Sequence, residues 1–271
     1  TRLPGGMRRR GCGGSSGGSG GTGGSGIPGG SGDPNNGEST TSGPAYSVPG
    51  SVALVAFNEG AAQTGNECAI DTSQLAQGVV GASARNDARL KFQVVKGEMS
   101  YNYDLPGDGT PIIVPINMGD GPYTFRVMQN TSGNNYVELF SVIENVNLSS
   151  ETAPFLVPNM FVNYNESSAV VAKARELAQG AANQGDVVRN IYQWVVDNIT
   201  YDHDKAAQLA SATGYVPDPD ATLASGTGIC FDYAALMTSM LRMENVPTKL
   251  VVGYSGSVYH AWISVYTRES G

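Results

Sequence analysis

Alternating apolar and polar positions make the chain strand-like from about residue 51. Leu90, Phe92 and Val94 alternate with polar or smaller residues, and residues 123–127 repeat this period of two, which is typical of half-buried strands. Shorter runs of similar character lie at residues 52–57, 77–81, 99–103, 111–114 and 136–143. Turn-forming Gly, Pro, Asn and Asp residues separate them at hairpin-like spacing. The pattern predicts an antiparallel β-sandwich-like domain over residues 51–165.

The apolar spacing becomes helical in residues 166–271. The Ala-rich residues 167–179, followed by Gly180, predict one helix. A second helix is expected to begin with Asp186 as its N-cap, and a third begins at Cys230. The remaining elements expected are a loop at 214–220 and two strands at 249–254 and 260–266. The predicted fold class is therefore α+β, with helices concentrated in the second half.

Glycine is concentrated at the N-terminus, where residues 1–50 hold 18 of the 36 glycines. Such a composition cannot bury a core, so residues 1–50 are predicted to be a disordered Gly/Ser-rich tether. This gives three parts: the tether, the β-rich domain at 51–165 and a third domain at 166–271. Residues 51–271 hold 12 basic and 22 acidic residues. Their net negative charge argues against nucleic acid as a partner.

Cys12 follows three arginines and precedes the Gly/Ser stretch. A cysteine followed by a flexible tether resembles the mature start of a bacterial lipoprotein, whose lipidated cysteine holds the chain on a membrane. This resemblance implies a lipid anchor at Cys12 and an extracellular or cell-surface location. Nowhere does the sequence show the roughly 18 to 20 consecutive apolar residues that a membrane-spanning helix needs.

Cys230 is the cysteine whose surroundings suggest chemistry. The other two, Cys12 and Cys68, lie far from it in the sequence, so the three predict neither a disulfide framework nor a paired metal motif. At the start of a helix the dipole favours the thiolate, which is the nucleophilic form. Gly226 and Gly228 are expected to turn the chain tightly and leave space for a substrate before the sulfur.

The chain offers two histidines as the base for such a nucleophile, His203 and His260. His203 lies in a polar stretch after a helix and is expected to be a solvated surface residue. His260 opens the strand that follows the Cys230 helix by one hairpin. Packing of that strand on the helix would bring the imidazole to the sulfur, which makes His260 the predicted partner.

These residues also carry a family resemblance. The run from Gly228 to Ala234, Gly-Ile-Cys-Phe-Asp-Tyr-Ala, and the later His260-Ala-Trp262 resemble the core of the transglutaminase-like superfamily. The resemblance implies a papain-like α+β domain in which Cys230 attacks an acyl group and His260 transfers the proton. It also implies a β-rich region before that domain, as in some bacterial extracellular proteins.

The family pattern includes a third, acidic residue after the histidine, which orients the imidazole. Glu269 is the sole acid downstream of His260, so the domain is expected to be truncated at its C-terminus. Asp232, two residues into the helix, is assigned to capping rather than to catalysis. Trp262 is expected either to line a substrate channel or to fill the core.

Several functions remain open at this point. A Cys230 thioester resolved by water would make the protein a protease or amidase, and one resolved by a lysine amine would make it a cross-linking transglutaminase. Without the third residue, the protein is alternatively a degenerate cell-surface binding or scaffold protein. Metal binding by Cys230 and His260 is a poorer explanation, because two ligands do not make a structural zinc site. No cofactor motif is present. The family resemblance implies a protein or peptide substrate as the partner, with a substrate associated with the cell wall as one option.

Overall fold

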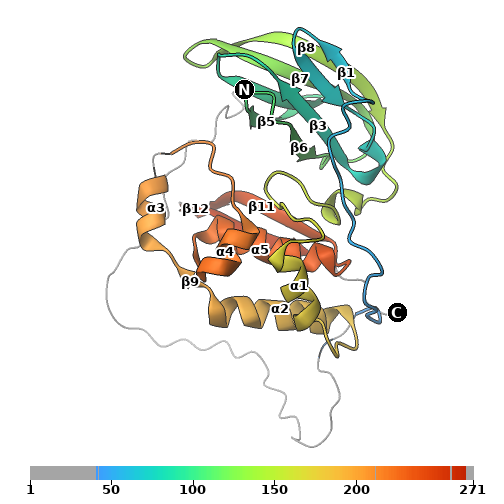
Figure 1. The fold of residues 1–271 in the computed structure, drawn as a ribbon, viewed down its shortest axis with the longest axis vertical. Coiled ribbons are helices and arrows are strands. Elements are labelled where there is room, and N and C mark those ends of the chain that lie inside the picture. Colours follow the sequence, from blue (N-terminus) through green and yellow to red (C-terminus); the bar gives the residue numbers. More distant parts are fainter. Residues whose placement is uncertain (1–40, 42, 211, 257, 267–271) are drawn as a thin grey trace, which may run out of the picture.

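Two β-sheets lie above a helical part in Figure 1. The computed structural model describes residues 41, 43–210, 212–256 and 258–266. The first sheet has the order β1-β2-β3-β6 and contains β1 (Gln63–Gly65), β2 (Cys68–Asp71), β3 (Val79–Ala84) and β6 (Ile112–Pro115). The second has the order β5-β4-β7-β8 and contains β4 (Leu90–Lys96), β5 (Met99–Leu105), β7 (Gly121–Ser132) and β8 (Asn135–Val146). Every neighbouring pair in both sheets is antiparallel.

The two sheets share one hydrophobic core, which confirms the predicted sandwich. Leu90, Phe92 and Val94 of β4 are buried while the residues between them are half-buried, as the alternation predicted. Phe92 stacks on Phe125 of β7 with ring centroids 6.4 Å apart. Ile70 of the other sheet is fully buried in the same cluster. Burial of these inner faces is what holds the sheets together.

The strand predicted at residues 52–57 is wrong. These residues pair with no strand, and the segment leads instead from the helical part up to β1 (Figure 1). The sequence pattern also missed the β1–β2 hairpin, whose turn places Asn66 and Glu67 at positive φ values of 52° and 58°. Two successive positive φ values are the geometry of a type I′ hairpin turn.

The strand expected at 77–81 begins at Val79. The preceding residues form a short 3-10 helix, η1 (Leu75–Gln77), which ends at Gly78 with a φ of 88°. A side chain at position 78 would meet Pro154, at 2.5 Å from its nearest atom. Pro154 belongs to η2 (Ala153–Phe155), so glycine permits both the turn and this close packing.

The second part of the chain is built around one helix, α5 (Cys230–Met243). Around it pack α1 (Ala169–Leu177), α2 (Gln184–Asn198), α4 (Pro219–Ser225), β11 (Thr248–Ser255) and β12 (Val258–Val265). Strands β11 and β12 form an antiparallel hairpin. From Phe231 to Met243, every residue of α5 except Tyr233 is buried. The predicted α+β class is therefore confirmed, with helices and hairpin enclosing a second core.

Two details of the helices differ from the prediction. The N-cap of α2 is Asn183, whose side chain accepts a hydrogen bond from the Asp186 backbone N–H at 3.0 Å. Asp186 lies in the first turn, where its charge suits the helix dipole. Two short helices were not predicted, α3 (His203–Leu209) and α4. Each begins after an aspartate N-cap, Asp202 and Asp218 respectively.

Residues 43–52 form a segment that we call the N-terminal strap, and it packs on the helical part. The Tyr46 backbone N–H donates to Ala182 O at 3.1 Å, and the Tyr46 hydroxyl donates to Glu244 beyond the end of α5. Val52 is buried in the core around α5. The division at residue 50 between tether and domain stays a prediction, because residues 1–40 lie outside the described part. The strap itself lies against the helices.

A row of aromatic rings joins the sandwich to α5. Tyr103 of β5 lies 6.0 Å from Phe161, which lies 5.7 Å from Phe231 in the first turn of α5. Farther along the helix, buried Arg242 donates to Val157 O at 2.6 Å. These contacts hold the segment after β8, which contains Val157 and Phe161, against the helix that begins with Cys230. Among the described residues, no helix has the length and apolarity to cross a membrane.

Candidate functional site

Cys230 is the first residue of α5. Ile229, the N-cap, has an extended backbone with φ −93° and ψ 174°. Cys230 is half-buried and packs against a small cluster of Phe231, Ala234 and Ala261. The predicted position at a helix N-terminus is therefore present. There the helix dipole and the N–H groups of the first turn favour the thiolate.

His260 is the third residue of β12 and not its first. It pairs with Gly253 of β11. Ala261 and Ile263 pack into the clusters around α5, and His260 and Trp262 alternate with them along the strand. Strand β12 thus packs on α5 through Ala261 and Ile263, and this packing does not itself bring His260 to Cys230. The pairing of thiol and imidazole themselves stays a prediction.

Trp262 does not fill the core. Its side chain is 39% exposed and passes beside Gly253, where an added Cβ would lie 3.3 Å from the ring. Trp262 therefore lies against Gly253, the residue of β11 that pairs with His260. Of its two expected roles, core filling is wrong, and lining of a substrate channel stays a prediction.

His203 is exposed at the start of α3, as expected for a surface histidine. Its ring lies against Tyr201, with centroids 5.0 Å apart.

The segment before Cys230 is held by a short parallel pairing. Strand β9 (Thr200–Tyr201) pairs with β10 (Thr227–Gly228), and the Asp202 N–H donates to Gly228 O at 2.9 Å. Gly226 has a φ of 66°, so the tight turn predicted there exists. Gly228 serves a different purpose from the one expected, because an added Cβ would lie 2.7 Å from Asp232 Cβ. Its missing side chain makes room for Asp232.

Asp232 is fully buried and holds the start of α5 together. Its Oδ2 accepts the Ile229 N–H at 2.8 Å and the Lys205 ammonium at 2.8 Å. Its Oδ1 accepts the Tyr215 hydroxyl. The capping role assigned to Asp232 is therefore present, and it is joined by an ion pair that the sequence did not predict.

Lys205 and Tyr215 are the residues near this site that sequence reasoning missed. The Lys205 ammonium lies 4.9 Å from the Tyr215 ring centroid. Burial lowers the pKa of Lys205, but the hydrogen bonds and charges of Asp232 and Tyr215 together outweigh this effect, so that the pKa is raised. Burial and Asp232 raise the pKa of Tyr215 to about 12. Both side chains thus stay protonated at neutral pH. No motif signals them, because they meet Asp232 only through the fold.

Other predicted residues lie away from this region. Cys12 and Glu269 are outside the described part of the chain. Cys68 is buried in the sandwich core, and burial raises the pKa of its thiol. In the described part, no group of three or more His, Cys, Asp or Glu residues is placed to hold a metal ion.

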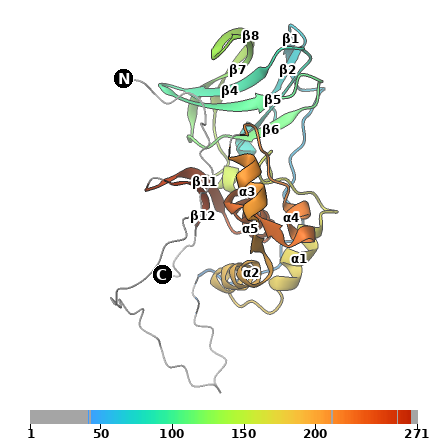
Figure 2. The same ribbon diagram turned by 90° about the vertical axis from the view of Figure 1, so that its left-hand side faces the viewer.

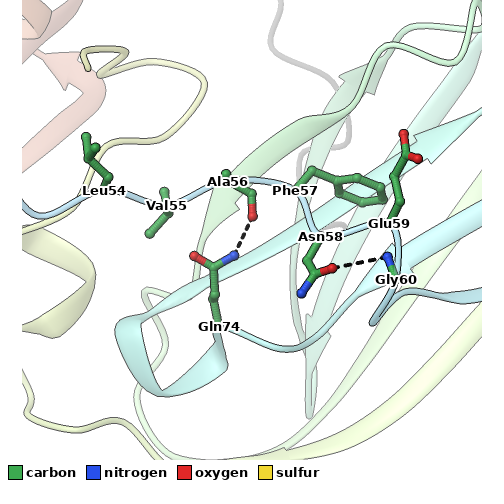
Figure 3. Close-up of a pocket in the computed structure, with 8 residues that line it drawn as sticks. All are labelled: Leu54, Val55, Ala56, Phe57, Asn58, Glu59, Gly60 and Gln74. Atoms are coloured by element: carbon green, nitrogen blue, oxygen red, sulfur yellow. Dashed lines mark hydrogen bonds between the residues drawn. The ribbon is translucent and has the colours of Figure 1, made fainter. Parts of the chain in front are cut away.

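A surface pocket lies along residues 54–60 and not at Cys230. Figure 3 shows Gln74 donating to the Ala56 carbonyl and the Gly60 N–H donating to the Asn58 side chain. The Gln74 contact ties the segment to the residue before η1, and the Gly60 contact lies within the segment. The pocket shares no lining residue with the predicted site.

Comparisons with known proteins place the second part of the chain in a family. Residues 171–271 match the model of the Transglutaminase-like superfamily. UPF0252 protein MJ1282 from Methanocaldococcus jannaschii is 25% identical over 194 residues, which cover 67% of this chain and 53% of that protein. The chain thus spans about half the length of this curated relative.

Two solved structures show weaker likenesses. A candidate cysteine protease from Cytophaga hutchinsonii has a TM-score of 0.37 and 15% identity, covering 70% of this chain and 71% of that one. The periplasmic domain of TgpA from Pseudomonas aeruginosa has a TM-score of 0.33 and 15% identity, covering 78% and 69%. The family match, together with a cysteine at the start of α5 and a histidine on the strand packed against it, identifies residues 171–271 as a transglutaminase-like domain.

Proposed function

We propose that the protein is a cysteine-dependent acyl transferase or hydrolase acting on peptide or carboxamide bonds. The observation that carries this proposal is the position of Cys230 as the first residue of a buried 14-residue helix. The helix dipole and the N–H groups of the first turn stabilise the charged form of a thiol at that position. His260, which lies on the strand β12 packed against the same helix, is the base in this proposal.

The reaction follows from these two groups. His260 takes the Cys230 proton, and the sulfur attacks the carbonyl carbon of the amide. A carbon–sulfur bond forms, the carbon–nitrogen bond breaks, and the imidazolium returns its proton to the leaving amine. The resulting thioester is resolved by water, which gives a carboxylate, or by a lysine amine, which gives a new amide. Either step restores the thiol.

The experiment is the rate of Cys230 alkylation by iodoacetamide across pH, followed by mass spectrometry. We expect a midpoint well below the free-thiol value of about 8.5. In His260→Ala the midpoint should return toward that value, since the imidazolium partner of the thiolate is lost. His203→Ala is the matched control, because His203 is an exposed histidine on α3. Its midpoint should equal that of the unaltered protein.

Cys68 provides an internal reference in the same spectra. It is buried and its thiol pKa is raised, so it should react slowly in every variant. A Cys230 midpoint near 8.5 that is the same in His260→Ala would contradict the proposal. It would favour the alternative, a binding or scaffold protein. With an activated thiol, peptide amides offered with and without a lysine donor would separate hydrolysis from cross-linking by product mass.

An extracellular or cell-surface location, with a lipid anchor at Cys12, is a second proposal that rests on sequence alone. Mass spectrometry of the native protein tests it. An added diacylglyceryl mass on Cys12 would support the anchor, and an unmodified Cys12 would exclude it.

A further inference from the structure

The start of α5 is enclosed by a closed ring of contacts that includes no residue of the proposed reaction. The Asp202 N–H donates to Gly228 O, and the Asp202 side chain accepts the Lys205 N–H at 2.8 Å. The Lys205 ammonium and the Ile229 N–H then meet on the same oxygen of Asp232. Because Gly228 and Ile229 are bonded neighbours, these contacts close a ring directly before Cys230.

The ring pairs a negative charge on Asp232 with a positive charge on Lys205. Asp232 is fully buried and lies two residues from Cys230 in the first turn of the helix. An uncompensated buried carboxylate in the same helical turn disfavours a second negative charge nearby and would raise the pKa of the thiol. Lys205, whose side chain is 29% exposed, supplies the compensating charge at 2.8 Å.

We propose that Lys205 is a positioning residue for Cys230, which holds the 226–229 turn through Asp232 and cancels the charge that would otherwise suppress the thiolate. This inference rests on the proposed function, because it assigns Lys205 a purpose only if the thiolate is the reacting form. Lys205 does not touch substrate in this scheme. It acts through Asp232.

Tyr215 completes the arrangement from the segment before α4. Its hydroxyl donates to the second oxygen of Asp232, and its ring lies 6.3 Å from that of Phe231. Without Lys205, Tyr215 and the Ile229 N–H would still hydrogen-bond the carboxylate but leave its charge in place. The titratable groups that these contacts place at the start of α5 are Asp202, Lys205, Tyr215 and Asp232. Tyr233 lies in the first turn itself, and Tyr259 and His260 lie on β12, which packs on α5.

The test compares Cys230 alkylation across pH in the full chain and in Lys205→Met. We expect the midpoint to rise by about one pH unit, so that the rate at pH values well below both midpoints falls about tenfold. Lys173→Met is the matched control. Lys173 also forms an ion pair, with Glu176 at 2.7 Å, and also lies over an aromatic ring, that of Trp194 at 5.4 Å. It belongs to α1, and its removal should leave the midpoint unchanged.

Two further variants separate charge from loss of structure. Lys205→Arg keeps the positive charge and should keep the midpoint within a few tenths of a unit. Lys205→Met combined with Asp232→Asn removes both charges and should return the midpoint toward that of the unaltered protein. A double variant as slow as Lys205→Met alone would overturn the electrostatic role, as would a Lys205→Met profile identical to that of Lys173→Met.

The outcomes also distinguish this inference from the proposed function. The proposed function depends on the absolute midpoint of the unaltered protein and on its loss in His260→Ala. The role of Lys205 depends on the difference between Lys205→Met and the unaltered protein. A low Cys230 midpoint that is the same in Lys205→Met and in the unaltered protein would therefore contradict this inference and leave the proposed function standing.

Discussion

Gly228 is a residue before Cys230 at which any side chain would collide with buried Asp232. An added Cβ would stand 2.7 Å from Asp232 Cβ and 3.2 Å from its Oδ2. Gly228→Ala should therefore displace Asp232 and cost about 1 to 3 kcal/mol of unfolding free energy. Urea unfolding measures this cost, and alkylation of Cys230 should slow in parallel.

Gly50→Ala is the control for that substitution. Nothing lies within 4 Å of an added Cβ at Gly50, so the change should stay within about 0.5 kcal/mol. Equal stabilities for the two variants would show that the contact between Gly228 and Asp232 is not tight.

At the level of the element, Asn183 determines where α2 begins. Its side chain accepts the Asp186 N–H, so Asn183→Ala should cost about 1 kcal/mol of unfolding free energy. Asn198→Ala, at the other end of the same helix, removes an exposed hydrogen bond to Trp194 O and should cost less than about 0.5 kcal/mol. Thermal or urea unfolding of both variants checks the difference. A larger loss in Asn198→Ala would mean that the end of α2 matters more than its cap.

The elements also show what the sequence could and could not predict. Strands with strict alternation, such as β4, follow from pattern because one face must be buried. The start of α5 at Cys230 follows from the helix-forming run after the glycines. Residues 52–57 are as apolar as a strand but have no partner, and pairing is not visible in composition. Lys205 and Tyr215 reach Asp232 from 27 and 17 residues away along the chain, which local patterns do not encode.

At the scale of the whole molecule, the N-terminal strap joins distant parts of the chain through Glu244. Glu244 is buried and accepts the Tyr46 hydroxyl. Burial raises the pKa of its carboxyl above the usual 4.5, so the folded protein holds this proton more tightly than the unfolded chain does. Stability should therefore fall as pH rises above 4.5 and level off once Glu244 is ionised in the folded state as well.

Urea unfolding at a series of pH values from 4 to 8 measures this dependence. In Glu244→Gln the fall assigned to this carboxyl should disappear. Glu151→Gln is the control, because Glu151 is exposed outside the strap and should leave the dependence unchanged. An identical slope in Glu244→Gln and the unaltered protein would contradict the role given to Glu244.

The strap has one more consequence, for how the sandwich is attached. The chain leaves the helical part after Val52 and returns to it through the segment with Phe161 (Figures 1 and 2). Two segments of the chain therefore connect the sandwich to the helical part. A protease that cuts within residues 53–62 would leave the sandwich attached through the second segment. Tension applied from the N-terminal side would be borne first by the strap against α2 and the end of α5, before it reached any strand.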